Sequence, residues 1–357
     1  MNTERNMQST TERVIYSLRD LYERYGYAQY KMNKFEEYDL YVRNKSFLLS
    51  DHIITFTDTD GKLMALKPDV TLSIVKSSNA KDGVKKVYYN ENVYRVPKGA
   101  FSFKEIMQTG LECIGDIDSY SVVEVLTLAA KSLETVSNDF VLDVSDLGII
   151  SSLIDSMDVS KEGRERIIEA IGEKSVHSID AICRELLVDR DKAQMLIELA
   201  SFSGDAEEML KILKGSDCYC EAEGFAEIMT LLSSVFGNKV RIDFSVIDDM
   251  RYYNGIVFKG FVKGIPTSVL SGGRYDGLMS RMGKSGGAIG FAVYLDLIDS
   301  LEDDGEEYDA DVFVLYKKDN SLESIAKAVE VCITEGKRVQ SGRSIPEGLR
   351  YKELIEL

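Results

Sequence analysis

The chain has 357 residues, 44% of them hydrophobic, which is enough for a packed core and predicts two domains or one large domain with appendages. Its 60 acidic and 43 basic residues give a net charge of -17, which argues against a protein that covers the phosphates of a nucleic acid. The apolar runs fall short of the roughly 20 residues of a membrane span, and the polar N-terminus lacks the apolar stretch of a signal peptide. Together with five scattered cysteines, this pattern predicts a cytoplasmic protein without membrane or nucleic-acid partners.

The first part of the chain combines helices with several short strands. Apolar residues recur at helical spacing over 10–24 and predict a helix, which a Ser-x-x-Glu capping box at 9–12 would begin. Two apolar runs, 53–57 and 63–66, flank an Asp-Thr-Asp-Gly turn and predict a hairpin. Further expected elements are strands over 87–94 and 108–114, a loop over 97–103, a helix over 121–136 and a strand over 140–144.

The second part begins with a helical region and then returns to strands. Helical patterns dominate 160–236 and predict a helical insertion, after which apolar and polar residues alternate over 240–246 in the period of a half-buried strand. Also expected are strands over 256–262 and 267–270, a helix over 290–301, a linker over 302–308, a strand over 312–316 and a helix over 321–335. We therefore expect an α+β core over 1–301 that contains the insertion, and a truncated C-terminal α/β segment over 309–357 with little chain left to complete it.

Three features that could suggest catalysis or metal binding have simpler interpretations. The Gly-Lys-Ser sequence at 283–285 ends like a phosphate-binding loop, but Leu278 stands where that motif needs a glycine, so a glycine-rich turn is favoured. The Cys-x-Cys pair at 218–220 lacks a second ligand pair. His52 and His177 lie outside any glycine-marked or carboxylate-rich segment. We expect no metal site, no cofactor and no histidine-based catalysis.

Four segments look unlike ordinary core. In one of them Gln108, Gly110 and Glu112 are spaced by two residues, so on a strand all three would point to one face, with room above the glycine for a ligand. Asp69 and Thr71 make a similar pair in another. These groups could hold an ammonium group and a polar side chain, or could form a buried hydrogen-bonded network without a ligand, and the spacing leaves both open. The four segments are 66–71, 93–95 with 104–112, 250–258, and 271–277 with 288–292.

In this order the four segments resemble the histidyl-tRNA synthetase family of the class II synthetase fold. The third is similar to the family's histidine-specific tyrosine pair, and the fourth to its Gly-Gly-Arg-Tyr-Asp-Gly stretch and the start of class II motif 3. The resemblance covers roughly 10–301 and implies an antiparallel sheet flanked by helices, a homodimer and a pocket for histidine. The ligand-binding residues that it implies are Asp69, Thr71, Arg95, Gln108, Glu112, Tyr252 and Tyr253.

The catalytic positions depart from the family's pattern. Asp248 and Leu297 stand where the enzymes carry arginines that face ATP, and Pro97 stands where an acid follows the motif 2 arginine, which is kept as Arg95. An aspartate beside reacting phosphates would repel them. The resemblance therefore implies an amino-acid pocket without a working ATP site, and we expect no catalytic residue. Asn33 replaces the motif 1 proline, a change expected to alter the dimer contact.

These departures are similar to those of the family's non-catalytic regulatory members. By resemblance, such a chain is required by the short form of ATP phosphoribosyltransferase, the catalytic subunit of the first step of histidine biosynthesis, in an expected hetero-octamer. Free histidine is the expected effector and would bring feedback inhibition. Two alternatives stay open, namely a divergent histidyl-tRNA synthetase and a synthetase-like amino-acid-binding module with another partner.

Overall fold

The computed structural model describes residues 10–48, 52–78, 83–96, 101–247, 253–298 and 308–357. The predicted capping box at 9–12, the loop over 97–103 and the linker over 302–308 lie partly outside these ranges. The chain divides into two compact units, Thr11–Leu301 and the C-terminal segment Glu302–Leu357. Each unit contains its own sheet and its own apolar core.

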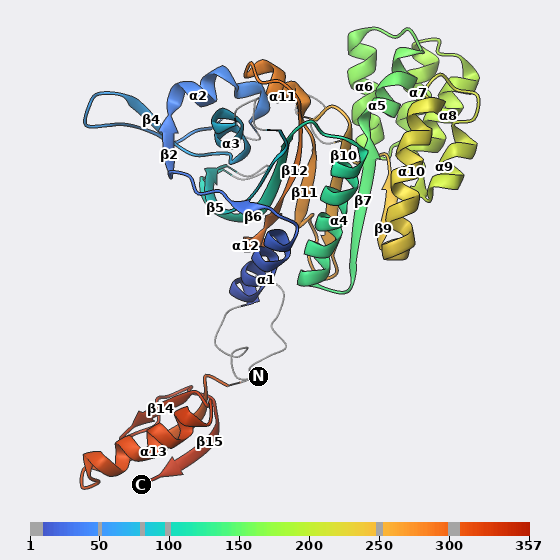
Figure 1. Ribbon diagram of the computed structural model, residues 1–357. Coiled ribbons are helices and arrows are strands. Elements are labelled where there is room, and N and C mark those ends of the chain that lie inside the picture. Colours follow the sequence, from blue (N-terminus) through green and yellow to red (C-terminus); the bar gives the residue numbers. More distant parts are fainter. Residues whose placement is uncertain (1–9, 49–51, 79–82, 97–100, 248–252, 299–307) are drawn as a thin grey trace. The chain divides into compact units, whose positions relative to one another are not determined.

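The described part of the larger unit is built on one nine-stranded sheet (Figure 1). In spatial order its strands are β1 (Ala28–Gln29), β5 (Lys85–Arg95), β6 (Lys104–Gly115), β12 (Gly287–Tyr294), β11 (Leu270–Arg274), β10 (Ile256–Val262), β7 (Phe140–Asp146), β9 (Val240–Asp243) and β8 (Ser203–Gly204). Neighbouring strands run antiparallel, except that β1 pairs with β5 and β7 pairs with β9 in parallel. The sheet is thus predominantly antiparallel, as the resemblance predicts.

Two helices cover one face of this main sheet. α1 (Thr10–Arg24), whose predicted bounds are confirmed, and α4 (Ser119–Val136) bury apolar stripes against the strands. α4 begins after Asp118, whose side chain accepts a hydrogen bond of 2.8 Å from the Ser121 amide and so satisfies one of the free N–H groups of the first turn. On α1, Tyr22 is fully buried in the same cluster. This apolar layer forms most of the core beneath the central strands.

The opposite face carries a smaller sheet and short helices. These elements are β2 (Phe35–Glu37), β4 (Leu63–Leu66) and β3 (Thr55–Thr57), with α2 (Tyr38–Arg43), the 3-10 turn Lys45–Phe47, α3 (Thr71–Ser77) and α11 (Asp276–Arg281). β3 and β4 form the hairpin that the sequence predicts. An ion pair between the buried Lys67 and Glu91 links the segment after β4 to β5. The small sheet is therefore held to the main sheet by charge as well as by a second apolar cluster.

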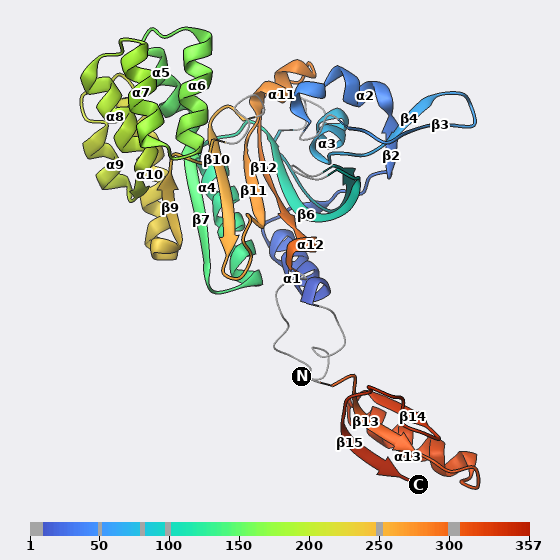
Figure 2. The same ribbon diagram turned by 180° about the vertical axis from the view of Figure 1, so that it is seen from behind.

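Beyond β7 and β9 the chain forms a compact group of helices (Figures 1 and 2). They are α5 (Leu147–Asp155), α6 (Lys161–Gly172), α7 (Val176–Glu185), α8 (Arg190–Ser201), α9 (Ala206–Ile212) and α10 (Tyr219–Phe236). The predicted helical region is confirmed, although α5 places its start before residue 160. Side chains of Ser160, Asp189 and Asp205 accept hydrogen bonds from first-turn amides and define where three of these helices begin.

The helix predicted over 290–301 is wrong. Most of its first half belongs to β12, and only the short α12 (Leu295–Ile298) follows. β12 lies between β6 and β11, and six of its eight residues are buried while Ala292 and Tyr294 are half-buried. Such a strand is one continuous apolar run without the two-residue alternation of a half-buried strand, so periodicity alone does not separate it from a helix.

Two predicted strands have different ends. The strand predicted over 267–270 is β11, which begins only at Leu270 and runs on through the glycine pair that weakened the sequence signal. The strand predicted over 240–246 stops at Asp243, because the Asp243 carboxylate accepts a hydrogen bond of 2.9 Å from the Ser245 amide and turns the chain. Phe244 stays buried although it has left the strand.

The C-terminal unit is a three-stranded parallel sheet with one helix. In spatial order the strands are β14 (Val339–Gly342), β13 (Ala310–Leu315) and β15 (Tyr351–Glu356), and α13 (Leu322–Thr334) packs on them. The predicted strand over 312–316 and helix over 321–335 are confirmed. The rest of the chain adds β14 and β15, which the sequence did not predict because these strands are largely exposed and carry few apolar residues.

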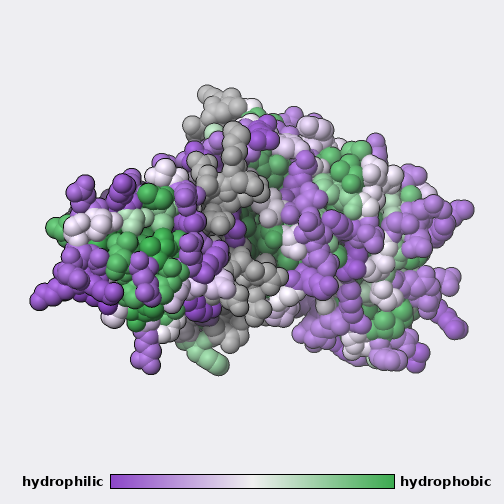
Figure 3. Space-filling model, turned by 90° about the horizontal axis from the view of Figure 1, so that it is seen from below, coloured by the Kyte–Doolittle hydropathy of each residue, from purple (hydrophilic) through white to green (hydrophobic). Residues whose placement is uncertain are grey.

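Figure 3 shows one face of the protein, on which hydrophilic residues prevail and hydrophobic areas also occur. Among the residues that the structure describes, no helix combines the length and the apolar character that a membrane crossing requires.

Candidate functional site

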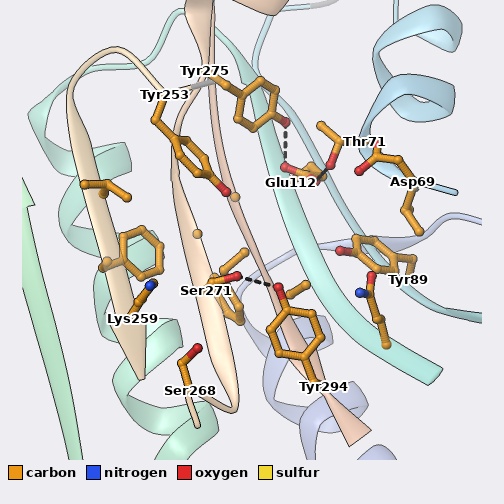
Figure 4. Close-up of a pocket in the computed structure, with 18 of the residues that line it drawn as sticks. Asp69, Thr71, Tyr89, Glu112, Tyr253, Lys259, Ser268, Ser271, Tyr275 and Tyr294 are labelled. Atoms are coloured by element: carbon orange, nitrogen blue, oxygen red, sulfur yellow. Dashed lines mark hydrogen bonds between the residues drawn. The ribbon is translucent and has the colours of Figure 1, made fainter. Parts of the chain in front are cut away.

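A cavity of about 170 Å³ lies on the face of the main sheet that α1 and α4 leave free (Figure 4). Six of the seven predicted ligand-binding residues line it, namely Asp69, Thr71, Arg95, Gln108, Glu112 and Tyr253. The seventh, Tyr252, lies outside the described residues. Sequence analysis missed further polar residues of the lining, which include Tyr89, Lys259, Ser268, Ser271, Tyr275 and Tyr294. Ser271 and Tyr275 stood within a segment that the sequence marked, whereas the others gave no local signal.

Alternation along β6 decides which of its residues reach the cavity. Gln108 and Glu112 line the cavity, whereas Leu111 and Cys113 belong to the apolar layer under α1 and α4. This is the arrangement that the two-residue spacing predicts, because successive side chains of a strand point to opposite faces. The same strand therefore supplies both a polar floor and part of the core.

Two glycines leave the space that the cavity side chains fill. A Cβ on Gly290 would stand 1.8 Å from Glu112 Oε2, and a Cβ on Gly273 would stand 2.6 Å from Cδ1 of the Tyr253 ring. Both distances are far shorter than van der Waals contact, so any side chain at these positions must push its neighbour aside. The glycines of β11 and β12 thus fix where Glu112 and Tyr253 lie.

Two details differ from the sequence interpretation. Gly110 does not leave room for a ligand, because a Cβ there would stand 2.7 Å from the Tyr89 hydroxyl, which occupies that space. Asp69 and Thr71 are not spaced along a strand but lie at the start of α3, where Asp69 Oδ1 accepts a hydrogen bond of 2.9 Å from the Leu72 amide. Both residues still line the cavity.

Glu112 is almost completely buried, with 2% of its surface exposed. The Thr71 hydroxyl donates to its Oε1 over 2.8 Å and the Tyr275 hydroxyl donates to its Oε2 over 2.5 Å. Burial nevertheless raises the pKa of Glu112 to about 8, because the charged form loses its hydration. Glu112 therefore combines the two interpretations that the sequence left open, since it belongs to a buried network and also lines the cavity.

Arg95 and Tyr294 form another part of the cavity wall. The Arg95 guanidinium carbon lies 6.0 Å from the centre of the Tyr294 ring, within reach of a cation–π interaction. The hydroxyls of Tyr294 and Ser271 share a hydrogen bond of 2.6 Å. Burial raises the pKa of the Asp69 carboxyl, and the positive charge of Arg95 opposes that rise. Arg95 and Asp69 are thus electrostatically coupled within one cavity.

The family's catalytic positions are only partly described. Leu297 packs against the apolar core of the larger unit, whereas Asp248 and Pro97 lie outside the described residues. Asn33 is exposed in the segment between β1 and β2. Among the described residues, no group of three or more His, Cys, Asp or Glu side chains is arranged to hold a metal ion. The lining of acids, cations and tyrosines is chemically suited to a small zwitterion.

The histidyl-tRNA synthetase family model matches residues 5–298. The chain belongs to the histidyl-tRNA synthetase family. It is 30% identical over 291 residues to an ATP phosphoribosyltransferase regulatory subunit of Caldanaerobacter subterraneus subsp. tengcongensis, which covers 78% of this chain and 75% of that protein.

Solved structures of related proteins share the fold. A Bacillus halodurans C protein, described as an ATP phosphoribosyltransferase regulatory subunit/histidyl-tRNA synthetase, gives a TM-score of 0.74 at 22% identity and covers 97% of this chain and 93% of its own. A chain of the ATP phosphoribosyl transferase (HisG:HisZ) complex from Thermotoga maritima gives 0.61 at 17% identity, covering 79% and 96%. These matches confirm the predicted class II synthetase-like sheet flanked by helices.

The contact between Gly290 and Glu112 generates a stability prediction. We expect Gly290→Ala to lower the free energy of unfolding by about 1–3 kcal/mol, because the added methyl forces Glu112 or the β12 backbone to move. Urea denaturation followed by circular dichroism measures the change. Gly277→Ala is the matched control, since a Cβ at that position of α11 has no atom within 4 Å. Equal stability of the two variants would contradict the packing described for Glu112.

The raised pKa of Glu112 predicts how stability depends on pH. The unfolded carboxyl ionises near its ordinary pKa of about 4.3, whereas the folded one ionises at about 8. Between these values the folded state holds a proton that the unfolded state has lost, so the contribution of Glu112 to stability falls as pH rises through this window. We expect Glu112→Gln to gain stability relative to the parent from about pH 5 to about pH 8.

Thermal unfolding of both proteins at stepped pH values tests this expectation. The control is Glu105→Gln, because Glu105 is an exposed residue of β6 whose pKa is lowered, chiefly by a hydrogen bond from Tyr94. The difference in stability between Glu105→Gln and the parent should stay constant over the same pH range, because Glu105 loses its proton below that range. A flat difference for Glu112→Gln as well would show that Glu112 is ionised in the folded protein at neutral pH.

Proposed function

We propose that this chain is a non-catalytic regulatory subunit of ATP phosphoribosyltransferase, required by a separate short-form catalytic subunit in the first step of histidine biosynthesis. One contrast within the family fold carries the proposal. Six residues that we predict to bind an amino acid line one cavity, whereas the position that the resemblance assigns to the motif 3 arginine holds Leu297, which is partly buried against the core. A leucine cannot stabilise charge on a phosphate, so the pocket suits binding without reaction.

The relatives support this role and a partner. The Caldanaerobacter protein, at 30% identity, is named as a regulatory subunit of the same transferase. The Thermotoga chain of similar fold comes from a complex whose name joins two proteins, HisG and HisZ. We extend this to an assembly in which homodimers of the present chain bind the short catalytic subunit in a hetero-octamer. The homodimer itself is an inference from the class II fold.

Free histidine is the effector that we assign to the cavity. Asp69 and Glu112 would meet its ammonium and imidazole groups, and Arg95 would pair with its carboxylate. Thr71 and Gln108 would add hydrogen bonds, and Tyr252 and Tyr253 would enclose the ring. The burial of Gln108 and Glu112, at 5% and 2% exposed, makes each hydrogen bond to a ligand stronger than it would be in water.

Feedback by histidine requires two states of the assembly that bind it unequally. A ligand shifts an equilibrium only by its difference in affinity for the two states, and a coupling of about 1–3 kcal/mol changes affinity roughly 5- to 150-fold. In this proposal the cavity is the effector site and the partner's active site is the distant one. The end product of the pathway then lowers the activity of its first enzyme.

Reconstitution with the short catalytic subunit tests the proposal. We expect phosphoribosyl-ATP formation to rise at least tenfold when this chain is added, and histidine to suppress it. Glu112→Ala should raise the histidine concentration needed for inhibition by at least tenfold, because a buried cation is left unpaired. Glu105→Ala, an exposed glutamate on the same strand, should behave like the parent. Equal activity with and without this chain would refute the regulatory role.

The alternative is an enzyme, a divergent histidyl-tRNA synthetase, and the match to the synthetase family model supports it. We expect no histidine-dependent ATP–pyrophosphate exchange by the pure protein, because loss of one charge stabiliser commonly costs about 2.7–4 kcal/mol in the barrier and two arginines are replaced. Measurable exchange that depends on histidine would establish the enzyme instead. A partner other than the transferase, found by co-purification, would favour the third possibility of an amino-acid-binding module.

A further inference from the structure

A lysine that the family resemblance did not mark reaches the cavity from the far side. Lys259 lies on β10 and lines the same space as Asp69 and Glu112. Figure 4 shows Lys259 and Ser268 on one side of the cavity and Asp69, Thr71 and Glu112 on the other. Lys259 thus lies on the side of the cavity opposite Asp69 and Glu112, whereas the other cation, Arg95, is coupled to Asp69.

Strand register explains why Lys259 faces the cavity. In antiparallel strands, directly paired residues lie on the same face of the sheet. One row of such pairs crosses five strands, from Tyr89 to Gly110, then to Ala292, Ser271 and finally Lys259. All five residues of this row except Gly110 line the cavity. The pairing of β10 with β11 therefore places Lys259 on the face of the sheet that carries the cavity.

The distance across the sheet fits a ligand of amino-acid size. Glu112 on β6 and Lys259 on β10 are separated by three strand intervals, or about 14 Å between backbones at roughly 4.8 Å per interval. The Glu112 carboxyl lies over Gly290, and Lys259 stands on the same face, two residues along β10 from Val257, which shares a pairing row with Glu112. The span left between carboxyl and ammonium is on the scale of one small molecule with opposite charges at its two ends.

Arg95 and Lys259 both contribute positive charge to the cavity lining. Arg95 is 8% exposed, its guanidinium lies over the Tyr294 ring, and its charge acts on the Asp69 carboxyl within the protein. Lys259 lies near the same tyrosine, because its cross-strand partner Ser271 shares a hydrogen bond with the Tyr294 hydroxyl. Hydroxyls next to an ammonium group form a suitable binding position for an anion.

From this arrangement we propose that Lys259, with Ser271 beside it, binds the carboxylate of the amino-acid effector and makes the cavity select for ligands that carry one. The inference rests on the proposed effector role of histidine and adds a residue to it. The ligand then lies across the sheet, with its cationic groups toward Asp69 and Glu112 and its carboxylate toward β10. An analogue without the carboxylate loses its contacts with Lys259 and Arg95 and keeps those of its cationic groups with Asp69 and Glu112.

Isothermal titration calorimetry of this protein with histidine and with histidinol, which lacks the carboxylate, tests the proposal. We expect Lys259→Met to weaken histidine binding roughly 10- to 100-fold, the usual effect of losing a charged hydrogen bond, and to change histidinol binding less than threefold. Lys259→Arg should restore most of the affinity for histidine. Lys263→Met is the matched control, because Lys263 follows the same strand and its side chain is 80% exposed beside Asp139.

Three results would overturn the proposal. Unchanged histidine affinity in Lys259→Met would show that the lysine does not contact the ligand. An equal loss for histidine and histidinol would show that its contact is not with the carboxylate. If the parent protein binds neither compound, histidine is not the effector in this cavity and the proposal fails with it. The regulatory role is judged separately by activation of the catalytic subunit in the absence of histidine, so the two failures are distinguishable.

Discussion

A carboxyl group buried at the centre of the main sheet constrains everything around it. Removing Glu112 from water is unfavourable unless hydrogen bonds replace the lost hydration, and both oxygens receive one, from Thr71 and from Tyr275. These donors come from segments about forty and one hundred and sixty residues away along the chain, so the network holds α3, β6 and the start of α11 together. The space for the carboxyl exists only because β12 has Gly290 beside it.

The two faces of the main sheet differ in character: one packs against the apolar core and the other carries the cavity. Under α1 and α4 the strands contribute large apolar side chains, and this layer supplies the hydrophobic stabilisation of the larger unit. On the other face the same strands contribute glycines, hydroxyls and charged groups around a cavity. The polar face is tolerable because its groups are hydrogen-bonded or placed near opposite charge, as Arg95 is near Asp69. Leu297, at the position that the resemblance assigns to motif 3, packs against the apolar side.

Local patterns in the sequence gave correct secondary structure where one face of an element meets water. The helix Thr10–Arg24 and the β3–β4 hairpin were predicted correctly because their apolar residues recur with the period of the element. The prediction failed for β12, which is covered on both faces and shows no period, and it missed β14 and β15, which are too exposed to show an apolar run. The burial of β12 comes from neighbours distant in the chain, and β14 and β15 are strands because they pair with β13.

The sequence by itself determined the family, the two-face pattern of β6 and six of the cavity residues, because these follow from motifs and from spacing within one segment. Only the tertiary structure decided that Tyr89 fills the space above Gly110, that Tyr275 binds Glu112, and that Lys259 reaches the cavity. The physical reason is strand register. The residues that are neighbours across a sheet are set by the pairing of strands that lie far apart in the sequence. The periodicity within one segment does not contain that information.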